Sequence, residues 1–286
     1  MKDLTVLSLF DGISCGQVAL ERAGLTVYLY LASEINEKSI RITEKNYPDT
    51  VQLGDVRNLK SESLPDIDLL IGGSPCQGFS LAGKLLNFDD PRSKLFFEFV
   101  RLKDECKPSW WLLENVKMRK EYRDVISMCL ETEPVEINSS LVSAQNRKRL
   151  YWTNIPFDLK NIKDKGLTLR DVIDGLYGED ITELFLSKKD GTLARVKADS
   201  NLRTLDDKAK CLTVGGQSIS KSGATNIILD NGKIYKMSPT ECERLQTLPD
   251  GYTDLGLKSN GYRYRVLGDC WTVDVVAEIL KGIASP

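Results

Sequence analysis

Strand-like and helix-like segments alternate along the first 131 residues of this 286-residue chain. Short apolar runs typical of buried strands lie at 4–10, 27–33, 51–56, 66–73 and 110–116. Segments with the helical spacing of apolar residues separate them, at 16–24, 36–46, 93–106 and 122–131. Because consecutive strands joined by helices generally run parallel, the sequence predicts an α/β fold with a parallel sheet covered on both faces.

A different composition begins near residue 156. The segment 187–233 is rich in Gly, Ser, Thr and Asn, and it contains nine Lys and Arg against five Asp and Glu. Helical spacing returns at 237–248 and again at 270–283. The net charge of the whole chain is −2, so any surface for nucleic acid is expected to be local.

Composition excludes several classes of function. The chain has no histidine, which excludes Ser-His and Cys-His catalytic pairs and zinc sites that need histidine. Its seven cysteines are scattered without a CxxC pair, so we expect reduced thiols rather than a disulfide framework. No apolar run reaches the ~18 residues of a membrane span, and the start of the chain lacks a signal-peptide pattern. We therefore expect a cytoplasmic protein with no membrane partner.

Three carboxylates follow the first three predicted strands: Asp11, Glu34 and Asp55. In a parallel sheet these strand ends share one edge, where ligands bind. The turn after the first strand reads DGISCG rather than GxGxxG, and its acidic residue disfavours a pyrophosphate. A nucleoside with a ribose and an amino-acid tail, such as S-adenosylmethionine, fits all three positions. Taken alone, Glu34 and Asp55 are also explained as helix caps or solvated loop residues, and the Asp11 segment as an ordinary glycine-rich turn.

A single thiol follows the fourth predicted strand, in the segment IGGSPCQGFS. The glycines and the proline around Cys76 indicate a loop that lets a flat ligand approach closely. A thiolate in such a loop is a candidate nucleophile. Other cysteines are expected to be small buried side chains: Cys106, Cys129, Cys211, Cys242 and Cys270.

Two more polar groups accompany this loop. Glu114 and Asn115 end the strand predicted at 110–116, which lies next to the Cys76 strand in the expected sheet; a structural cap is the alternative. In QNRKRLYW, Gln145, Arg147 and Arg149 alternate, so in one extended segment their side chains point to the same side. A structural arginine in a salt bridge is the alternative interpretation here.

These motifs resemble those of the C5-cytosine DNA methyltransferases, in order and spacing, over nearly the full chain. The matching segments are LSLFDGISCG, ASEI, GDV, GGSPCQGFS, ENV, QNRKRLYW and TECERLQTLPDGY, with some similarity to the animal de novo branch. The resemblance implies a Rossmann-like S-adenosylmethionine-dependent methyltransferase fold with a small target-recognition domain. It implies a catalytic domain over 1–155, completed by 237–286, and a target-recognition region over 156–236.

The resemblance also implies the residues around the methyl donor, S-adenosyl-L-methionine, and it implies no metal. One departure is GDCWTV at 268–273, where the family usually has Gly-Asn-Ser/Ala-Val; Trp271 is expected to pack beside the donor. The expected donor-binding residues are Phe10, Asp11, Gly12, Ile13, Ser14, Cys15, Gly16, Glu34, Ile35, Asp55, Val56, Arg57, Ser74, Pro75, Asp269, Cys270 and Trp271.

The implied activity is that of a DNA (cytosine-5-)-methyltransferase, which acts on a cytosine flipped out of the duplex. Cys76 is expected to add to C6 of the base, and Glu114 to contact N3 and the exocyclic amine. Asn115 is expected to fix the loop, Arg149 to bind O2, and Arg147 to orient Glu114 or a phosphate.

The implied partner is double-stranded DNA. The segment 83–91 is expected to close behind the flipped base, and 209–218 to read a groove, with a β-hairpin carrying solvated lysines as the alternative. A restriction endonuclease partner is a hypothesis, and so is a homodimer through an exposed phenylalanine of SKLFFEFVRL. We expect the protein to act in the cytoplasm of a prokaryotic cell or to be encoded by a virus.

Three other functions are consistent with parts of the sequence. A transfer-RNA methyltransferase would use the same chemistry, and KCLTV at 210–214 resembles that branch. A catalytically silent methyltransferase-like partner is disfavoured by the intact Cys76, Glu114 and Arg149. A nucleotide-dependent oxidoreductase is disfavoured by the absence of GxGxxG and by the acidic first turn.

Overall fold

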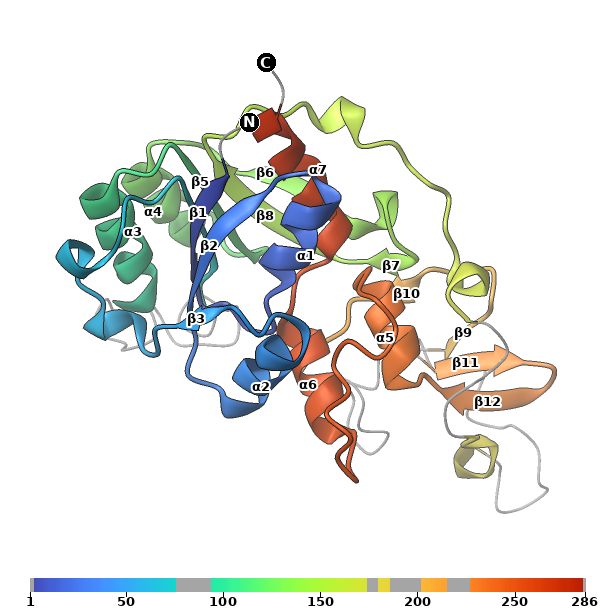
Figure 1. The fold of residues 1–286 in the computed structure, drawn as a ribbon. Coiled ribbons are helices and arrows are strands. Elements are labelled where there is room, and N and C mark those ends of the chain that lie inside the picture. Colours follow the sequence, from blue (N-terminus) through green and yellow to red (C-terminus); the bar gives the residue numbers. More distant parts are fainter. Residues whose placement is uncertain (1–2, 76–93, 174–179, 186–201, 215–226, 285–286) are drawn as a thin grey trace. The chain divides into compact units, whose positions relative to one another are not determined.

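The structure is a computed structural model that describes residues 3–75, 94–173, 180–185, 202–214 and 227–284 (Figure 1). Cys76, the segment 83–91 and the last part of 209–218 lie outside the described residues. The chain divides into two compact units. The first comprises Met1–Ile137, Lys148–Asn161 and Val273–Pro286, and the second Asn138–Arg147 and Ile162–Thr272. The boundaries at 155 and 236 between a catalytic domain and a target-recognition region stay a prediction.

The first unit is built on a seven-stranded sheet with the strand order β3-β2-β1-β4-β5-β8-β6. Its strands are β1 (Leu4–Leu9), β2 (Val27–Ser33), β3 (Val51–Gln52), β4 (Leu69–Gly73), β5 (Trp110–Val116), β6 (Val135–Asn138) and β8 (Lys148–Thr153). Strands β1 to β5 run parallel, as predicted, whereas β8 runs antiparallel to β5. The predicted α/β fold class is confirmed.

The described residues of this unit form five α-helices: α1 (Cys15–Arg22), α2 (Glu37–Asn46), α3 (Lys94–Cys106), α4 (Lys120–Leu130) and α7 (Val273–Ala284). Figure 1 shows α3 and α4 on one face of the sheet and α1 and α7 on the other. Helix α2 begins as predicted, because the Asn36 side chain accepts the N–H groups of Lys38 and Ser39. None of the described helices is both long and apolar enough to cross a membrane.

The apolar core of the first unit includes side chains from α3, α4 and the sheet. Phe96 and Phe99 of α3 are both 0% exposed and belong to this core together with Leu7 and Leu70. These two phenylalanines are therefore unavailable to a second subunit. Phe97 is partly buried and packs against the same core, so the dimer hypothesis has little apolar surface on α3 to support it.

Helix α7 completes the first unit by packing against α1 and against the chain at 155–156. Arg22 of α1 forms an ion pair with Asp274 of α7, with 2.6 Å between Nη1 and Oδ1. Near the end of α7, Gly282 has no room for a side chain: a Cβ there would lie 2.0 Å from the carbonyl oxygen of Pro156. Glycine is thus needed where the helix meets this backbone.

Replacing Gly282 with alanine is expected to lower the free energy of unfolding by roughly 1–3 kcal/mol, the usual cost of overpacking. The Pro156 carbonyl is backbone and can move only with the chain around it. Thermal unfolding would measure the loss. Lys281→Ala is the matched control, because Lys281 is half-exposed on the same helix and a surface change there costs about 0.5 kcal/mol or less. Equal melting temperatures for the two variants would contradict the prediction.

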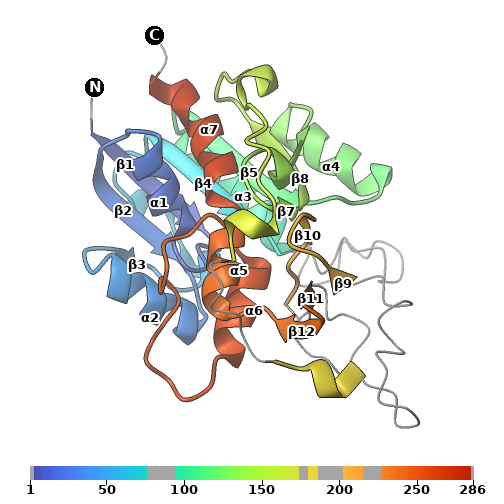
Figure 2. The same cartoon turned by 90° about the vertical axis from the view of Figure 1, so that its right-hand side faces the viewer.

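In its described residues, the second unit contains two small sheets and two α-helices. Strand β7 (Gln145–Asn146) pairs in parallel with β10 (Ala209–Lys210). Strands β9 (Leu202–Arg203), β11 (Ile227–Asp230) and β12 (Lys233–Lys236) form a three-stranded sheet. Helices α5 (Pro239–Leu245) and α6 (Gly261–Asp269) contact each other, and Figure 2 shows them side by side. The hairpin alternative for 209–218 depends on residues outside the described part of the chain.

Among the described residues of this unit, β11 and β12 form a hairpin. Its two turn residues, Asn231 and Gly232, have φ values of 47° and 75°, as a type I′ turn requires. The Asn-Gly dipeptide is a sequence signal for this hairpin, although the hairpin was not predicted from it. Helix α6 was not predicted, because its buried face includes Arg263 and Gly268 rather than a continuous apolar stripe.

Candidate active site

Hydrogen bonds join the carboxyl ends of β1, β2 and β3 in the first unit. The Gly12 N–H donates to Oε2 of Glu34 at 2.8 Å, which links the turn after β1 to the end of β2. The Ser33 hydroxyl donates to the Gly54 carbonyl at 2.7 Å, which links β2 to the segment after β3. The three predicted carboxylates therefore lie along one edge of the sheet, where parallel sheets bind ligands.

The Asp11 turn has an unusual backbone. Phe10, Gly12 and Ser14 have φ values of 56°, 62° and 56°, in the left-handed region that costs a non-glycine residue about 1 kcal/mol or more. The Asp11 carboxylate accepts hydrogen bonds from the Tyr30 hydroxyl, at 2.8 Å, and from the Ser14 hydroxyl. The carboxylate is thus held in place before any ligand binds. Nothing in the sequence singled out Tyr30.

Burial raises the pKa of Asp11 above its ordinary value of 3.8, and the nearby Glu34 carboxylate adds to this effect. Hydrogen bonds from Ser14, Ser8 and Tyr30 act in the opposite direction. Because burial is the largest of these effects, the folded protein binds a proton at Asp11 more tightly than the unfolded chain does.

Asp11→Asn is expected to change how stability depends on pH. A raised pKa in the folded state gives stability that is present below the unfolded pKa and lost as the pH rises through the folded pKa. The wild type should therefore gain stability relative to Asp11→Asn as the pH falls from about 7 towards about 4. Urea unfolding of both proteins across this range measures the difference, and a difference independent of pH would contradict the prediction.

Glu34 already accepts three backbone N–H groups. Besides that of Gly12, its carboxylate accepts the N–H groups of Ile35, at 2.7 Å, and Asn36, at 2.8 Å. An ionised carboxylate has about four acceptor positions, so roughly one remains for a ligand. The neighbouring Ile35 side chain is 70% exposed, which makes it available to a flat apolar ligand.

Asp55 is both a cap and half of an ion pair. Its carboxylate accepts the Arg57 N–H at 3.0 Å, at the start of the short 3₁₀ helix Val56–Asn58, and pairs with the Arg57 guanidinium. These bonds from Arg57 lower the pKa of Asp55. Asp55 is therefore a helix cap, as the alternative interpretation expected, and its carboxylate is held in the ionised form.

Six of the predicted donor-binding residues are buried within the first unit: Ile13, Ser14, Cys15, Gly16, Val56 and Ser74. Ile13, Cys15 and Val56 are 1%, 3% and 4% exposed. A Cβ on Gly16 would lie 2.5 Å from Ile71, so this glycine allows α1 to pack closely against β4. These residues shape the turn and its support, and their side chains face the protein interior.

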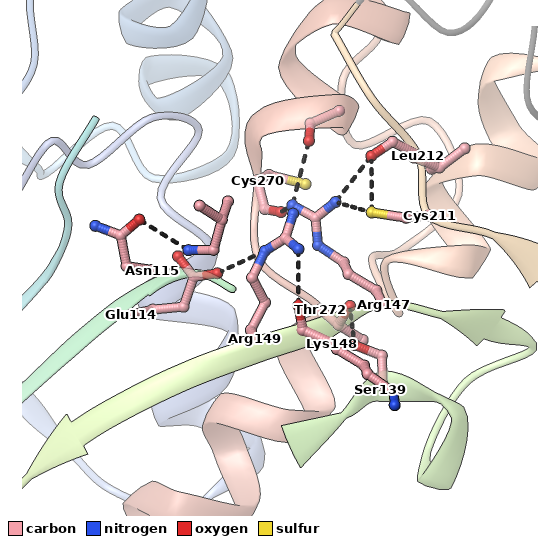
Figure 3. Close-up of polar contacts among 12 residues, drawn as sticks. Glu114, Asn115, Ser139, Arg147, Lys148, Arg149, Cys211, Leu212, Cys270 and Thr272 are labelled. Atoms are coloured by element: carbon pink, nitrogen blue, oxygen red, sulfur yellow. Dashed lines mark hydrogen bonds and ion pairs between the residues drawn. The ribbon is translucent and has the colours of Figure 1, made fainter. Parts of the chain in front are cut away.

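A buried ion pair lies at the end of β5. In Figure 3, Arg149 of β8 points to Glu114 of β5, with 3.0 Å between Nε and Oε1. Their side chains are 14% and 10% exposed. The antiparallel register, in which Arg149 lies opposite Val116, brings the two residues together. One residue of the sequence motif ENV therefore forms an ion pair with one residue of QNRKRLYW.

Asn115 links the same strand to the segment before Cys76. Its Nδ2 donates to the Ser74 hydroxyl at 2.9 Å and to the Ser74 carbonyl at 3.2 Å, while its Oδ1 accepts the Val116 N–H at 2.8 Å. Asn115 and Ser74 are 2% and 5% exposed, and Pro75 is half-buried. The side chain therefore fixes the position from which the Cys76 segment departs.

Arg147 belongs to the second unit and is 2% exposed. Its guanidinium donates to the carbonyls of Leu212, at 2.9 Å, Gly268, at 3.2 Å, and Cys270, at 2.9 Å (Figure 3). The expectation of one extended segment through Arg149 is wrong, because β7 pairs with β10 and β8 pairs with β5. The strand is interrupted at Arg147, where the chain passes from one sheet to another.

The predicted donor motif GDCW lies at the end of α6. Asp269 is exposed, Cys270 is 9% exposed and Trp271 is half-buried. These three residues belong to the second unit, whereas the other predicted donor-binding residues belong to the first.

Buried polar residues that the sequence did not single out support this motif. Thr272 donates to Gln246 at 2.9 Å and accepts a hydrogen bond from Ser139 at 2.8 Å. Gln246 donates to the Leu267 carbonyl at 2.7 Å. Since each group is buried, these hydrogen bonds satisfy polar atoms that water cannot reach.

Not every positive charge in 187–233 is available to a ligand, because Lys208 is already bound by backbone groups. Its ammonium donates to the carbonyls of Leu167, at 2.7 Å, Ser140, at 2.8 Å, and Ser143, at 3.3 Å. This lysine connects three segments of the second unit. A phosphate would have to compete with three backbone acceptors for it.

The cysteines follow the sequence expectation in part. Cys242 and Cys270 are buried, but Cys106, Cys129 and Cys211 are only half-buried. Burial raises the pKa of Cys106 and of Cys129. In the part of the chain that the structure describes, no group of three or more Cys, Asp and Glu side chains could hold a metal ion.

Comparison with known proteins gives a family match. The model for C-5 cytosine-specific DNA methylases matches residues 4–165 and 188–285. Type II methyltransferase M.NlaIV of Neisseria lactamica is 32% identical over 202 residues, covering 58% of this chain and 48% of that protein. Type II methyltransferase M1.ScrFI of Lactococcus lactis subsp. cremoris is 28% identical over 275 residues, covering 86% and 70%. Orphan methyltransferase M.SPRI of Bacillus phage SPR is 34% identical over 172 residues, covering 56% and 39%.

Solved structures share the fold at lower identity. The methyltransferase EhMeth of Entamoeba histolytica has a TM-score of 0.78 and 18% identity, covering 99% of this chain and 98% of that chain. A mutant DNMT2 of Spodoptera frugiperda has a TM-score of 0.76 and 22% identity, covering 99% and 100%. This chain spans about half the length of M.NlaIV. The family model, however, covers most of the chain, which therefore belongs to the C-5 cytosine-specific DNA methylase family.

Proposed function

We propose that this protein transfers the methyl group of S-adenosyl-L-methionine to C5 of a cytosine in double-stranded DNA, releasing S-adenosyl-L-homocysteine. The observation that carries the proposal is the buried Glu114–Arg149 pair at the end of β5, in a chain of this family. A carboxyl group held by a guanidinium at a ligand-binding sheet edge is suited to recognising the N3 and amine edge of a cytosine.

The carboxylates at the edge of the sheet fit the proposed methyl donor. The acidic turn at Asp11 favours a cationic amino group and repels phosphate. Glu34 has capacity for about one ribose hydroxyl, since three N–H groups already bind it. The exposed Ile35 offers an apolar surface to the adenine. When bound, the donor supplies a methyl group on an electrophilic sulfonium centre.

The proposed chemistry at the base uses Cys76, Glu114 and Arg149. The Cys76 thiolate forms a bond to C6, and the C5–C6 π electrons make C5 nucleophilic. Glu114, oriented by Arg149, donates a proton towards N3 as negative charge develops there. C5 then takes the methyl group, a base removes the C5 proton, and the sulfur–C6 bond breaks to restore the C5–C6 double bond. Asn115 contributes by fixing Ser74, two residues before the nucleophile.

The proposed DNA contacts include a segment of the second unit. Flipping the cytosine out of the duplex costs a few kcal/mol, which contacts to phosphates and bases offset. We assign the segment 209–214 of the second unit to nucleic acid, with the rest of 209–218 beyond the described residues. A restriction endonuclease partner is supported by the type II names of M.NlaIV and M1.ScrFI, whereas M.SPRI is named an orphan. Bacterial and phage relatives also support the cytoplasmic location.

The test is methyl transfer from tritiated S-adenosylmethionine to unmethylated duplex DNA. Wild type should label the DNA, and Cys76→Ser should not. Transfer RNA is the parallel substrate, because KCLTV at 210–214 resembles the branch that acts on it. Label in transfer RNA alone would overturn DNA as the substrate. Donor binding without label in either nucleic acid would favour the silent-partner alternative. Bisulfite sequencing of labelled DNA would then give the target sequence.

A further inference from the structure

Arg147 joins two segments that the proposed function assigns to different ligands. One is 209–214, assigned to nucleic acid, whose Leu212 carbonyl accepts from Nη1 at 2.9 Å. The other is GDCW, assigned to the methyl donor, whose Gly268 and Cys270 carbonyls accept from Nη2 at 3.2 Å and 2.9 Å. A single buried guanidinium therefore holds both segments by their backbones.

The end of α6 explains why an arginine is needed here. The last carbonyls of a helix have no partner within the helix, and the negative end of the helix dipole favours a cation. Gly268 lies in the last turn of α6 and Cys270 follows its last residue. The guanidinium presents several N–H groups in a planar fork, so it can reach these carbonyls and Leu212 together. A lysine ammonium is a point charge and cannot span the same set.

A second, independent contact joins the same segments. A Cβ on Gly268 would lie 2.4 Å from the carbonyl carbon of Thr213 and 2.4 Å from the Val214 nitrogen. The two backbones therefore touch where only a glycine fits, and both neighbours are backbone atoms that cannot rotate away. A shift of 211–214 is transmitted directly to α6.

Gln145 holds the other side of Leu212. Its Oε1 accepts the Leu212 N–H at 2.8 Å, while Arg147 binds the Leu212 carbonyl. The Gln145 amide also donates to the Leu245 carbonyl at 3.1 Å and to Gln246 at 3.2 Å. Gln246 in turn binds Thr272, directly after GDCW. Leu212 is thus fixed through both of its backbone groups to residues that support the donor motif.

We infer that Arg147 is a positioning residue that couples binding of the methyl donor at 269–271 to binding of nucleic acid at 209–214. This inference rests on the proposed function. It replaces the expectation that Arg147 orients Glu114 or a phosphate. A ligand that fixes one segment also fixes the other, so each ligand raises the affinity for its counterpart by the same factor.

Donor affinity with and without DNA tests the coupling. The parent protein is Cys76→Ser, in which methyl transfer cannot consume the ligands. Equilibrium dialysis with tritiated S-adenosylmethionine gives the donor Kd in the absence and presence of unmethylated duplex DNA. The variants are Arg147→Met and Arg147→Lys in this parent. Arg170→Lys is the matched control, because Arg170 lies in the same unit in an exposed pair with Asp206.

In the parent and in the Arg170→Lys control, duplex DNA is expected to lower the donor Kd by about fivefold or more. In both Arg147 variants this ratio should fall to about 1, although each still binds the donor. A ratio of 1 in the parent, or a parental ratio in Arg147→Met, would overturn the inference. A parent that binds no donor at all would instead contradict the proposed function.

Hydrogen exchange of the parent gives a measurement that needs no Arg147 variant, should these variants fail to fold. Addition of S-adenosylmethionine should slow exchange of the amides at 209–214. Unchanged exchange at 209–214, with slowed exchange at 269–271, would show donor binding without coupling and would overturn the inference.

Discussion

Glu114→Gln is expected to lower kcat for methyl transfer to DNA by roughly 10²–10⁴-fold, the range for loss of a general acid. Glutamine keeps the shape of the side chain and its hydrogen bond to Arg149, but it cannot supply a proton to N3. It also leaves the Arg149 guanidinium, 14% exposed, without the charge that it faces. The donor Kd should change little, because the predicted donor-binding residues of the first unit lie at other positions of the sheet edge.

Steady-state kinetics with tritiated donor would measure this loss. Glu136→Gln is the matched control, since Glu136 is a more exposed carboxylate of the same sheet that pairs with Lys117 at 2.9 Å. That variant should stay within about twofold of wild type, in keeping with the small energies of exposed ion pairs. If Glu114→Gln retained the kcat of Glu136→Gln, Glu114 would not be a catalytic residue.

Local patterns were sufficient to predict the edge of the sheet. Asp11, Glu34 and Glu114 could be placed together because each ends a strand whose apolar run is long enough to be unambiguous. The parallel order then puts these ends at one edge, whatever the details of packing. Asn36 caps α2 for a similarly local reason, because capping depends on a side chain and the next three residues.

Arg147 could not be placed in this way. Alternation in QNRKRLYW says which side chains share a face only while the strand continues, and the strand stops at Arg147. The partner of Gln145 is Ala209, more than sixty residues away, and no local pattern announces that pairing. The alternation therefore predicted neither the break at Arg147 nor the separate hydrogen-bond partners of the two arginines.

The supporting polar residues show a similar limit. Tyr30 binds Asp11 from the neighbouring strand, and Thr272 binds Ser139 across 133 positions. Such hydrogen bonds form where the packing leaves a buried donor opposite a buried acceptor. Tyrosine, threonine and serine are common on strands and loops, so their identity alone carried no signal.

Glu243 and Arg263 form a buried ion pair in the second unit. Their side chains are 0% and 7% exposed, with 2.9 Å between Oε1 of Glu243 and Nη2 of Arg263. The carboxylate also accepts the N–H groups of Gly251, at 2.7 Å, and Thr253, at 2.8 Å. The Glu243 carboxylate therefore holds both the turn after α5 and the Arg263 guanidinium of α6.

Glu243→Gln is expected to lower the free energy of unfolding by roughly 3–5 kcal/mol, the usual cost of breaking a buried ion pair. The Arg263 guanidinium would stay buried beside a neutral amide. With the amide oxygen at the Oε1 position, the amide NH₂ would face the Gly251 N–H, leaving two donors opposed. Urea unfolding measures the loss, and Asp206→Ala in the exposed pair with Arg170 is the control, expected to cost about 1 kcal/mol or less.

The double variant Glu243→Leu with Arg263→Met separates the cost of an unpaired charge from the value of the pair. Replacing both partners by apolar groups of similar size removes the buried charge altogether, and such changes are often close to neutral. The double variant should therefore be more stable than Glu243→Gln. If it were less stable, the N–H groups of Gly251 and Thr253 would be the larger contribution of Glu243. If Glu243→Gln cost no more than Asp206→Ala, the buried pair would have no special role in holding α6 to the turn.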